Sequence, residues 1–228
     1  ELNRENATLC SLGLITAQTI AGAISTGTHG SGMNSMSHFV VGVRFAIYDA
    51  SSGQATIEEL SAGESLQAAR CSLGSLGIIL AVRIRCRTQY NIQEHFTESR
   101  QLSDVLDAEA SFPIQQFYLI PWRWSYFSQH RKEVDRPRSR LARLYRLYWL
   151  GIMDYGLILQ ILFLTRLRSQ RLLRFSFRRI LTTFLIRNWK VTDRSSSMLV
   201  MRHDAFRHIE IELFVRRGQL ADALEFSR

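Results

Sequence analysis

A glycine-rich segment near the start of the chain, "TIAGAISTGTHGSG" (19–32), constrains the fold more than any other feature of the sequence. Glycine adopts backbone angles that are closed to other residues and lets a ligand approach the main chain closely. Backbone N–H groups and hydroxyls in such a loop suit a phosphate group or a flat heterocycle. A flexible surface linker is the alternative, but the apolar run "IAGAI" indicates a packed segment. We therefore expect a ligand-binding loop.

The segment that follows has the pattern of a small mixed domain. "HFVVGVRFAIYDASSGQATIEEL" predicts two strands around a turn, and "GESLQAAR" predicts a short helix with Leu66 and Ala69 on one side. In "CSLGSLGIILAVRIRC" a tight turn flanked by Gly74 and Gly77 precedes a strand that we expect to be buried at its start. The order loop, strand, strand, helix, strand predicts an α+β fold.

Composition changes near Gln89, and we expect one domain at 1–87 and a second at 88–228. The second should contain a helix around 102–110 and an aromatic strand, "IQQFYLIPW", halted by proline. The polar stretch "SQHRKEVDRPRSR" is expected to be an exposed loop or the entry to a helix. Near the end, "HIEIELFV" alternates as a strand does and "GQLADALEF" begins a helix. An apolar fraction of 46% and three prolines argue against disorder.

Cysteine usage indicates a reducing compartment and a cytoplasmic protein. The three cysteines, Cys10, Cys71 and Cys86, give neither a disulfide framework nor the spacing of a zinc site, and we expect Cys71 and Cys86 to be small core residues. No cluster of His, Cys and acidic residues has metal-ligand spacing, so no metal is expected. The chain begins without methionine or a secretory signal, as a central piece of a longer protein would.

The basic charge is concentrated between Arg131 and Lys190, which holds 15 Lys and Arg against three acids, whereas the whole chain has a net charge of +9. Arginines set among leucines and aromatics over 141–189 predict amphipathic helices with basic faces. The charge-free runs, 147–153 and 155–165, fall short of the ~20 residues that span a bilayer.

Three interpretations of this basic region remain open. Its arginines could associate peripherally with an anionic membrane surface. They could bind nucleic acid, although no recognised nucleic-acid motif accompanies them. They could also belong to a cap subdomain in which the arginine stems cover apolar surface. We expect no nucleic-acid partner, and possible membrane association through 131–190.

Two motifs in this order, "QTIAGAISTGTHGSG" and "AARCSLGSLGIILAVRI", resemble the FAD-binding (PCMH-type) domain of the vanillyl-alcohol-oxidase-type flavoproteins. More specifically, the two motifs resemble those of the aldonolactone oxidases (D-arabinono-1,4-lactone and L-gulonolactone oxidases). "QQFYLIPW" and "FRHIEIELFV" are similar to parts of their cap domain. The resemblance implies an α+β fold with a partial PCMH-type domain and a partial cap carrying a helical insertion at about 131–190. It also implies FAD-dependent oxidation of a CH–OH group in a sugar lactone or polyol, with electrons passed to oxygen or another acceptor.

The same resemblance implies which positions meet the cofactor, largely through the main chain: Thr19, Gly22, Ile24, Gly27, Thr28, Gly30, Ser31, Gly32, Met33 and Ile78. His29 belongs to the "GTHG" turn and does not match the histidine that attaches FAD covalently in many members. That histidine and its subdomain would precede the first residue. The catalytic Glu-x-Arg pair would follow the last one.

Catalytic residues are therefore unassigned. Glu210 and Glu212 beside His208 are interpreted as the polar face of a strand rather than an acid–base set. Because one wall of the expected flavin site would lie outside the chain, we expect weak retention of FAD. The alternative function is a non-catalytic remnant that associates with membranes through its basic helical region.

Overall fold

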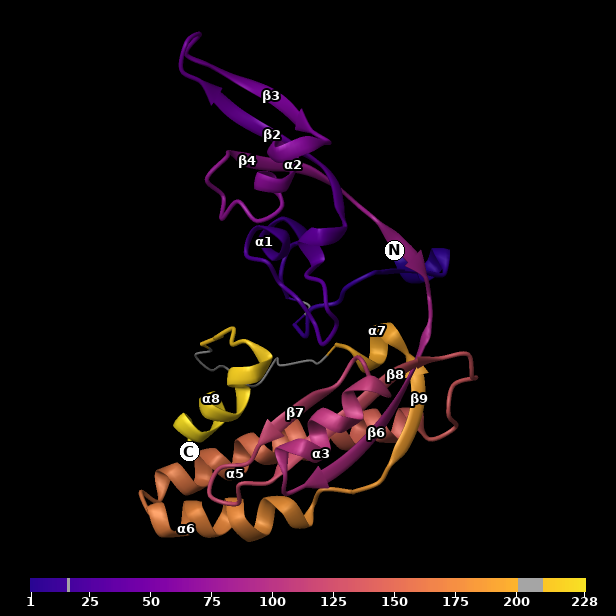
Figure 1. The fold of residues 1–228 in the computed structure, drawn as a ribbon, viewed down its shortest axis with the longest axis vertical. Coiled ribbons are helices and arrows are strands. Elements are labelled where there is room, and N and C mark those ends of the chain that lie inside the picture. The colour runs from indigo at the N-terminus through magenta and orange to yellow at the C-terminus, as the bar shows by residue number, and fades with distance from the viewer. Residues whose placement is uncertain (16, 201–210) are drawn as a thin grey trace. The chain divides into compact units, whose positions relative to one another are not determined.

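The computed structural model describes residues 1–15, 17–200 and 211–228, and these form two compact units (Figure 1). The first contains the described residues of Glu1–Tyr90 and Arg194–Met201, and the second those of Asn91–Asp193 and Arg202–Arg228. The change of unit after Tyr90 lies close to the expected domain boundary at 87–88. The identity of the two domains stays a prediction.

The first unit is built on a three-stranded antiparallel sheet in the order β3-β2-β4, with a separate two-stranded sheet, β1-β5. Its elements, in chain order, are η1 (Leu2–Glu5), β1 (Ala7–Leu9), α1 (Ile20–Ser25), η2 (Met36–Phe39), β2 (Val40–Asp49), β3 (Gln54–Leu60), α2 (Gly63–Ala69), β4 (Ile78–Ile84), β5 (Cys86–Thr88) and α7 (Ser195–Met198). The predicted strands, turn and short helix of this region are confirmed.

The core of this unit lies where α1 and α2 meet the sheet. Ile24 of α1, Leu66 and Ala69 of α2, and Val43 and Phe45 of β2 are buried in one cluster. The alternation of β2 places its inward residues on the helices, and Leu66 and Ala69 share a face because they are three residues apart. This cluster fixes α1, and with it the start of the glycine-rich segment, against the sheet.

The turn between β2 and β3 forms where the sequence predicted it, between the two strands. Gly53, at φ 70°, donates its N–H to the Asp49 carbonyl at 2.8 Å. The Asp49 carboxylate accepts from the Ser51 and Ser52 hydroxyls, each at 2.7 Å. These bonds, that of Ser51 first, lower the pKa of Asp49 to about 2.

Two expectations for the first unit are wrong. The start of β4 is not buried: β4 is an edge strand, and Ile78 is 72% exposed. Ile79 and Val82 both pack on the core although they are three residues apart, because the register with β2 shifts between the pairs Phe45↔Ile79 and Arg44↔Ala81. Cys71 and Cys86 are exposed rather than core residues. Cys71 lies in the turn after α2, and Cys86 on the two-stranded sheet, outside the helix-covered face.

The second unit has a four-stranded sheet in the order β7-β8-β6-β9, accompanied by helices (Figure 1). Its elements are β6 (Asn91–Ser99), α3 (Leu102–Asp107), η3 (Ala108–Ala110), β7 (Gln116–Leu119), β8 (Tyr126–Val134), α4 (Ala142–Tyr148), η4 (Trp149–Gly156), α5 (Leu157–Arg166), α6 (Gln170–Phe175), η5 (Ser176–Ile180), η6 (Leu181–Thr183), β9 (Lys190–Arg194), η7 (Arg217–Gln219) and α8 (Leu220–Phe226). The helix at 102–110, the aromatic strand and the last helix are confirmed.

The first part of the polar stretch, 128–134, which we expected to be an exposed loop or the entry to a helix, is instead part of an inner strand of this sheet, whereas 135–138 are exposed and irregular. Strand β8 pairs with β6 from Ser99↔Tyr126 to Asn91↔Val134 and with β7 on its other side. Its residues from Tyr126 to Arg131 are buried. The polar side chains are tolerated because they find partners inside the unit, as described below.

The prediction of helices in the basic region is confirmed. The prediction that its apolar segments are too short to span a bilayer is wrong. The helix continues through Asp154 from Ala142 to Arg166, combining α4, the π-helical η4 and α5. It is long and apolar enough to cross a membrane by length and composition, and α5 runs beside α6 (Figure 1). Core helices of soluble proteins meet the same two criteria.

The strand expected at 208–215 is not confirmed. Residues 208–210 lie outside the described residues, and 211–215 have no regular secondary structure. The apolar side chains of Ile211, Leu213 and Phe214 are exposed there.

Candidate functional site

The glycine-rich segment begins as a capped helix and continues as a closed loop. The Thr19 hydroxyl accepts the N–H of Gly22 at 3.1 Å, which starts α1. Thr28 closes the loop at both ends: its N–H donates to the Ala23 carbonyl, and its own carbonyl accepts the N–H of Met36, both at 2.9 Å. The residues between Thr28 and Met36 therefore form a loop tied to α1.

The glycines of this loop have different physical roles. Gly27 takes φ 71°, in the left-handed region, and turns the chain out of α1. A Cβ on Gly30 would overlap the carbonyl oxygen of Leu12, so this glycine allows two backbone segments to meet. A Cβ on Gly32 would meet no atom of the described residues within 4 Å. Gly32 is thus the place where the loop faces open space.

A row of backbone donors lies beside this open position. Within the described part of the chain, the N–H groups of Gly30, Ser31, Gly32 and Met33 donate to no protein acceptor. Successive main-chain N–H groups of this kind form sites for anions such as a pyrophosphate. Together with the open side of Gly32, they fit the anionic part of a dinucleotide cofactor.

The second motif packs against the first. The Leu73 N–H donates to the Ser25 carbonyl at 3.1 Å, and the Cys71 thiol lies 3.6 Å from the same oxygen. Gly77 takes φ 136° and approaches β2 so closely that a Cβ would lie 2.5 Å from the Ala46 carbonyl oxygen. The structure thus brings the turn at 71–77 to the end of α1.

Comparison with curated proteins gives one match over the whole chain. The chain is 84% identical over 229 aligned residues to a long-chain alcohol oxidase from an uncultured marine euryarchaeote, and covers 48% of that relative. It is 34% identical over 110 residues to L-gulonolactone oxidase from Bos taurus, and 41% identical over 97 residues to a putative D-arabinono-1,4-lactone oxidase from Neurospora crassa. These alignments cover 47% and 40% of this chain, and 24% and 16% of the relatives. No family model matches.

Solved structures share the fold at low sequence identity. A solvent-stable cholesterol oxidase superimposes with a TM-score of 0.57 at 11% identity, over 87% of this chain and 43% of that one. A mutant of cholesterol oxidase from Brevibacterium sterolicum gives 0.53 at 11% identity, over 60% of this chain and 30% of that one. The α+β fold class is confirmed.

The chain is thus similar to the FAD-linked oxidases of the vanillyl-alcohol-oxidase type, in agreement with the resemblance of its two motifs. FAD is the cofactor of this family. The chain spans about half the length of the relative that it matches from end to end.

The structure gathers most of the predicted FAD contacts on α1 and the loop after it. Thr19 and Gly22 lie at the exposed start of α1, whereas Ile24 is fully buried in the core. Met33 is 99% exposed at the tip of the loop. Ile78 lies outside the loop, at the start of β4, the strand that contacts α1. Their contact with FAD stays a prediction.

The histidines and acids of the sequence analysis form no acid–base set among the described residues. The Nδ1 atom of His29 lies 3.0 Å from the Gly30 carbonyl oxygen, within the loop itself. His208 and Glu210 lie outside the described residues, and Glu212 is exposed. Within the described ranges no group of three or more His, Cys, Asp or Glu could hold a metal ion.

A buried polar cluster in the second unit was missed by the sequence analysis. The Glu94 carboxylate on β6 pairs with the Arg131 guanidinium on β8 at 2.5 Å and accepts the Tyr145 hydroxyl of α4. Burial, and then the Glu94 charge, raise the pKa of Tyr145. The residues were overlooked because Arg131 lay in a presumed loop. The antiparallel register, which places Glu94 opposite Arg131, was the missing information.

Proposed function

We propose that this protein is an FAD-dependent oxidoreductase that oxidises the CH–OH group of an alcohol. The observation that carries the proposal is the 84% identity, over the whole chain, to a relative named long-chain alcohol oxidase. The lactone oxidases align with parts of the same chain and act, by their names, on CH–OH groups in sugar lactones.

FAD, when bound, supplies the acceptor for the hydride that leaves the alcohol carbon. The role of this chain in that reaction is to hold and orient the cofactor. The free N–H groups of Gly30 to Met33 bind its anionic part, and Gly32 keeps that approach free of a side chain. The turn at 71–77 supports the loop from α1.

Within the CH–OH class, we propose a long-chain alcohol as the substrate, with a sugar lactone or polyol as the alternative. The relative at 84% identity is named for long-chain alcohols. The lactone oxidases, which are named for sugar lactones, are 34% and 41% identical over less than half of this chain. Oxygen or another acceptor would reoxidise the cofactor.

The experiment grafts this chain into the matching half of the long-chain alcohol oxidase relative, loads that protein with FAD and mixes it, without oxygen, with a long-chain primary alcohol or with a sugar lactone. We expect the alcohol to remove the absorbance of the oxidised flavin. Loss of absorbance with the lactone alone would reverse the substrate choice. A bound flavin that neither compound reduces would contradict the proposed activity.

A second candidate function is peripheral association with an anionic membrane surface through 131–190, in a cytoplasmic protein. It is supported by the apolar helix Ala142–Arg166, on which Leu162 and Phe163 are 60% and 63% exposed beside arginines. Exposed apolar side chains enter the interface while basic residues meet acidic lipids. Co-sedimentation with phosphatidylserine vesicles, weakened by salt, tests it.

A further inference from the structure

The second unit contains a cavity of about 960 Å³ whose charge is entirely positive; we call it the arginine cavity. It lies between the turn that joins β7 to β8 and the segment α6–η5. Three aromatic residues, Trp122, Trp124 and Phe175, contribute to its walls. Among the described residues, its lining includes seven arginines and no acid: Arg100, Arg123, Arg171, Arg174, Arg178, Arg179 and Arg228.

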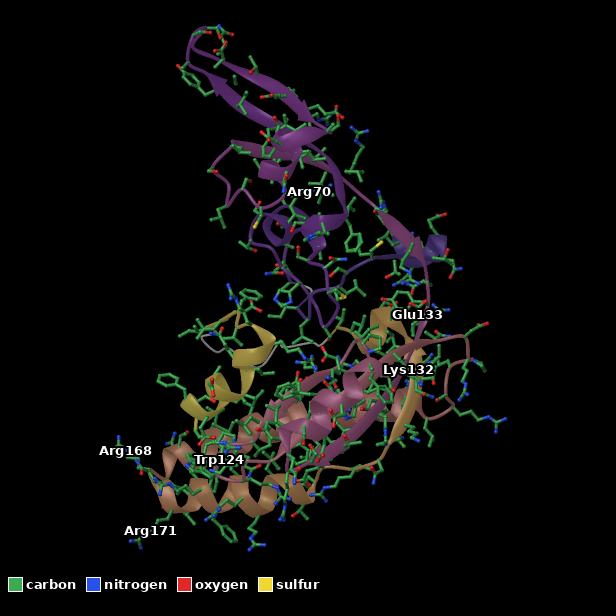
Figure 2. The ribbon with its side chains drawn as sticks, in the orientation of Figure 1. Arg70, Trp124, Lys132, Glu133, Arg168 and Arg171 are labelled. Carbon is green, nitrogen blue, oxygen red and sulfur yellow. The ribbon has the colours of Figure 1, made fainter. Side chains whose placement is uncertain are left out.

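One wall of the arginine cavity is helical. Arg171, Arg174 and Arg178 follow one another at spacings of three and four residues, which places them on one helix face. Arg178 and its neighbour Arg179 belong to the π-helical turn η5. Such wide turns occur often at functional sites. Figure 2 shows Arg171 near the end of the hairpin formed by α5 and α6.

The opposite wall is a turn in an uncommon conformation. Trp122 and Trp124 have φ values of 61° and 55°, in the left-handed region that bulky residues rarely occupy. The Arg178 guanidinium holds this turn by donating to the Trp122 carbonyl at 3.1 Å. The Trp122 ring meets Phe177 edge-on at 5.5 Å between ring centroids. Trp124, labelled in Figure 2, is thereby kept at the cavity wall.

Only part of the positive charge is balanced by acids. Arg123 pairs with Glu98 at 2.7 Å, and Arg228 pairs with Glu225 at 2.8 Å. Among the described residues, Arg100 and Arg174 have no acidic partner, and neither has Arg171. A concave surface with this excess of positive charge concentrates anions.

We propose that the arginine cavity binds a ligand carrying phosphate groups with at least two negative charges. Guanidinium groups form paired hydrogen bonds with phosphate oxygens. Several guanidinium groups that line one cavity therefore suit a diphosphate or a phosphomonoester. The tryptophans offer apolar surface to the remainder of the ligand, and the volume suits a small molecule. The ligand is either soluble or the headgroup of a lipid. The site is independent of the proposed alcohol oxidation.

The test measures binding of inorganic pyrophosphate to the 228-residue chain by titration calorimetry. The cavity variant carries Arg100→Gln and Arg174→Gln. The control carries Arg166→Gln and Arg168→Gln, which remove the same charge from exposed positions outside the cavity lining. Loss of two charge-assisted contacts should weaken binding at least about tenfold in the cavity variant, with a change below about twofold in the control.

A second measurement identifies the source of the phosphate group. The same variants are sedimented with phosphatidic acid vesicles and with phosphatidylserine vesicles of equal surface charge. Soluble pyrophosphate binding that only the cavity variant loses supports a soluble ligand. Selective phosphatidic acid binding that only the cavity variant loses supports a lipid headgroup.

Equal losses of pyrophosphate binding in the two variants would show general charge attraction and overturn the proposal. Absence of binding to both pyrophosphate and phosphatidic acid would overturn it as well. Circular dichroism of each variant confirms that it is folded before binding is measured.

Discussion

Single buried residues in the second unit decide how its polar sheet is stabilised. Glu94 and Arg131 are almost completely buried and pair at 2.5 Å, and Tyr145 donates to the same carboxylate. A buried charge that loses its partner destabilises a protein strongly, because the remaining ion is neither solvated nor paired.

Glu94→Gln should therefore lower the free energy of unfolding by about 3 kcal/mol. The control is Glu133→Gln, two strand positions beyond Arg131 on β8 and exposed (Figure 2), which should change it by less than about 0.5 kcal/mol. Chemical denaturation of the three proteins measures the difference. Equal stabilities would contradict the assigned role of the buried pair.

Histidines on the same two strands predict a pH dependence. Burial lowers the pKa of His130 below its ordinary 6.5, and the charge of His95 lowers it further. Burial, and then the charge of Lys190, lower the pKa of His95. Since the unfolded chain binds protons more readily than the folded one, the stability that these groups contribute is present above pH 6.5 and is lost as the pH falls below it.

Thermal unfolding followed between pH 7 and pH 5 should show this loss, and it should be smaller in His130→Gln. His38→Gln, an exposed position in the first unit, is the matched control and should keep the wild-type slope. An unchanged slope in the His130 variant would argue against the titration of that side chain.

At the level of elements, sequence patterns predicted the strands, turns and helices that depend on residues close together in the chain. The strands β2 and β3, the turn at Asp49 and the helix α2 follow from alternation, turn chemistry and apolar spacing. The strand β8 does not follow, because its polar residues are buried only after β6 and β7 have paired with it. The arginine cavity could not be predicted for the same reason, because Arg100, Arg174 and Arg228 are far apart in the sequence and come together only in the fold.

The helix Ala142–Arg166 carries the prediction for membrane association. Leu162→Ser with Phe163→Ser removes exposed apolar surface, so vesicle binding should fall several-fold while stability is unchanged. Ile57→Ser, at a position 69% exposed in the first unit, is the control and should bind vesicles normally. Wild-type binding by the double variant would contradict the second candidate function.

At the scale of the whole molecule, the family assignment came from two distant motifs that the fold brings together. The contacts of Leu73 and Cys71 with Ser25 join the turn at 71–77 to the end of α1. Position within a motif could not show that Ile24 is a core residue, or that Gly30 and Gly77 are required for contacts between backbone segments.

The measurement that tests the central claim most directly is a titration of FAD by the 228-residue chain, followed by flavin fluorescence. Gly32→Val adds a side chain at a position where a Cβ has no atom of the described residues within 4 Å. Gly218→Val is the control, since a Cβ there also meets no protein atom within 4 Å.

We predict saturable FAD binding, too weak to survive gel filtration, that Gly32→Val weakens at least about tenfold and Gly218→Val leaves unchanged. Thermal unfolding should be the same for all three proteins. Absence of saturable binding, or equal affinity of the Gly32 variant and the wild type, would contradict the assignment of this loop to the cofactor.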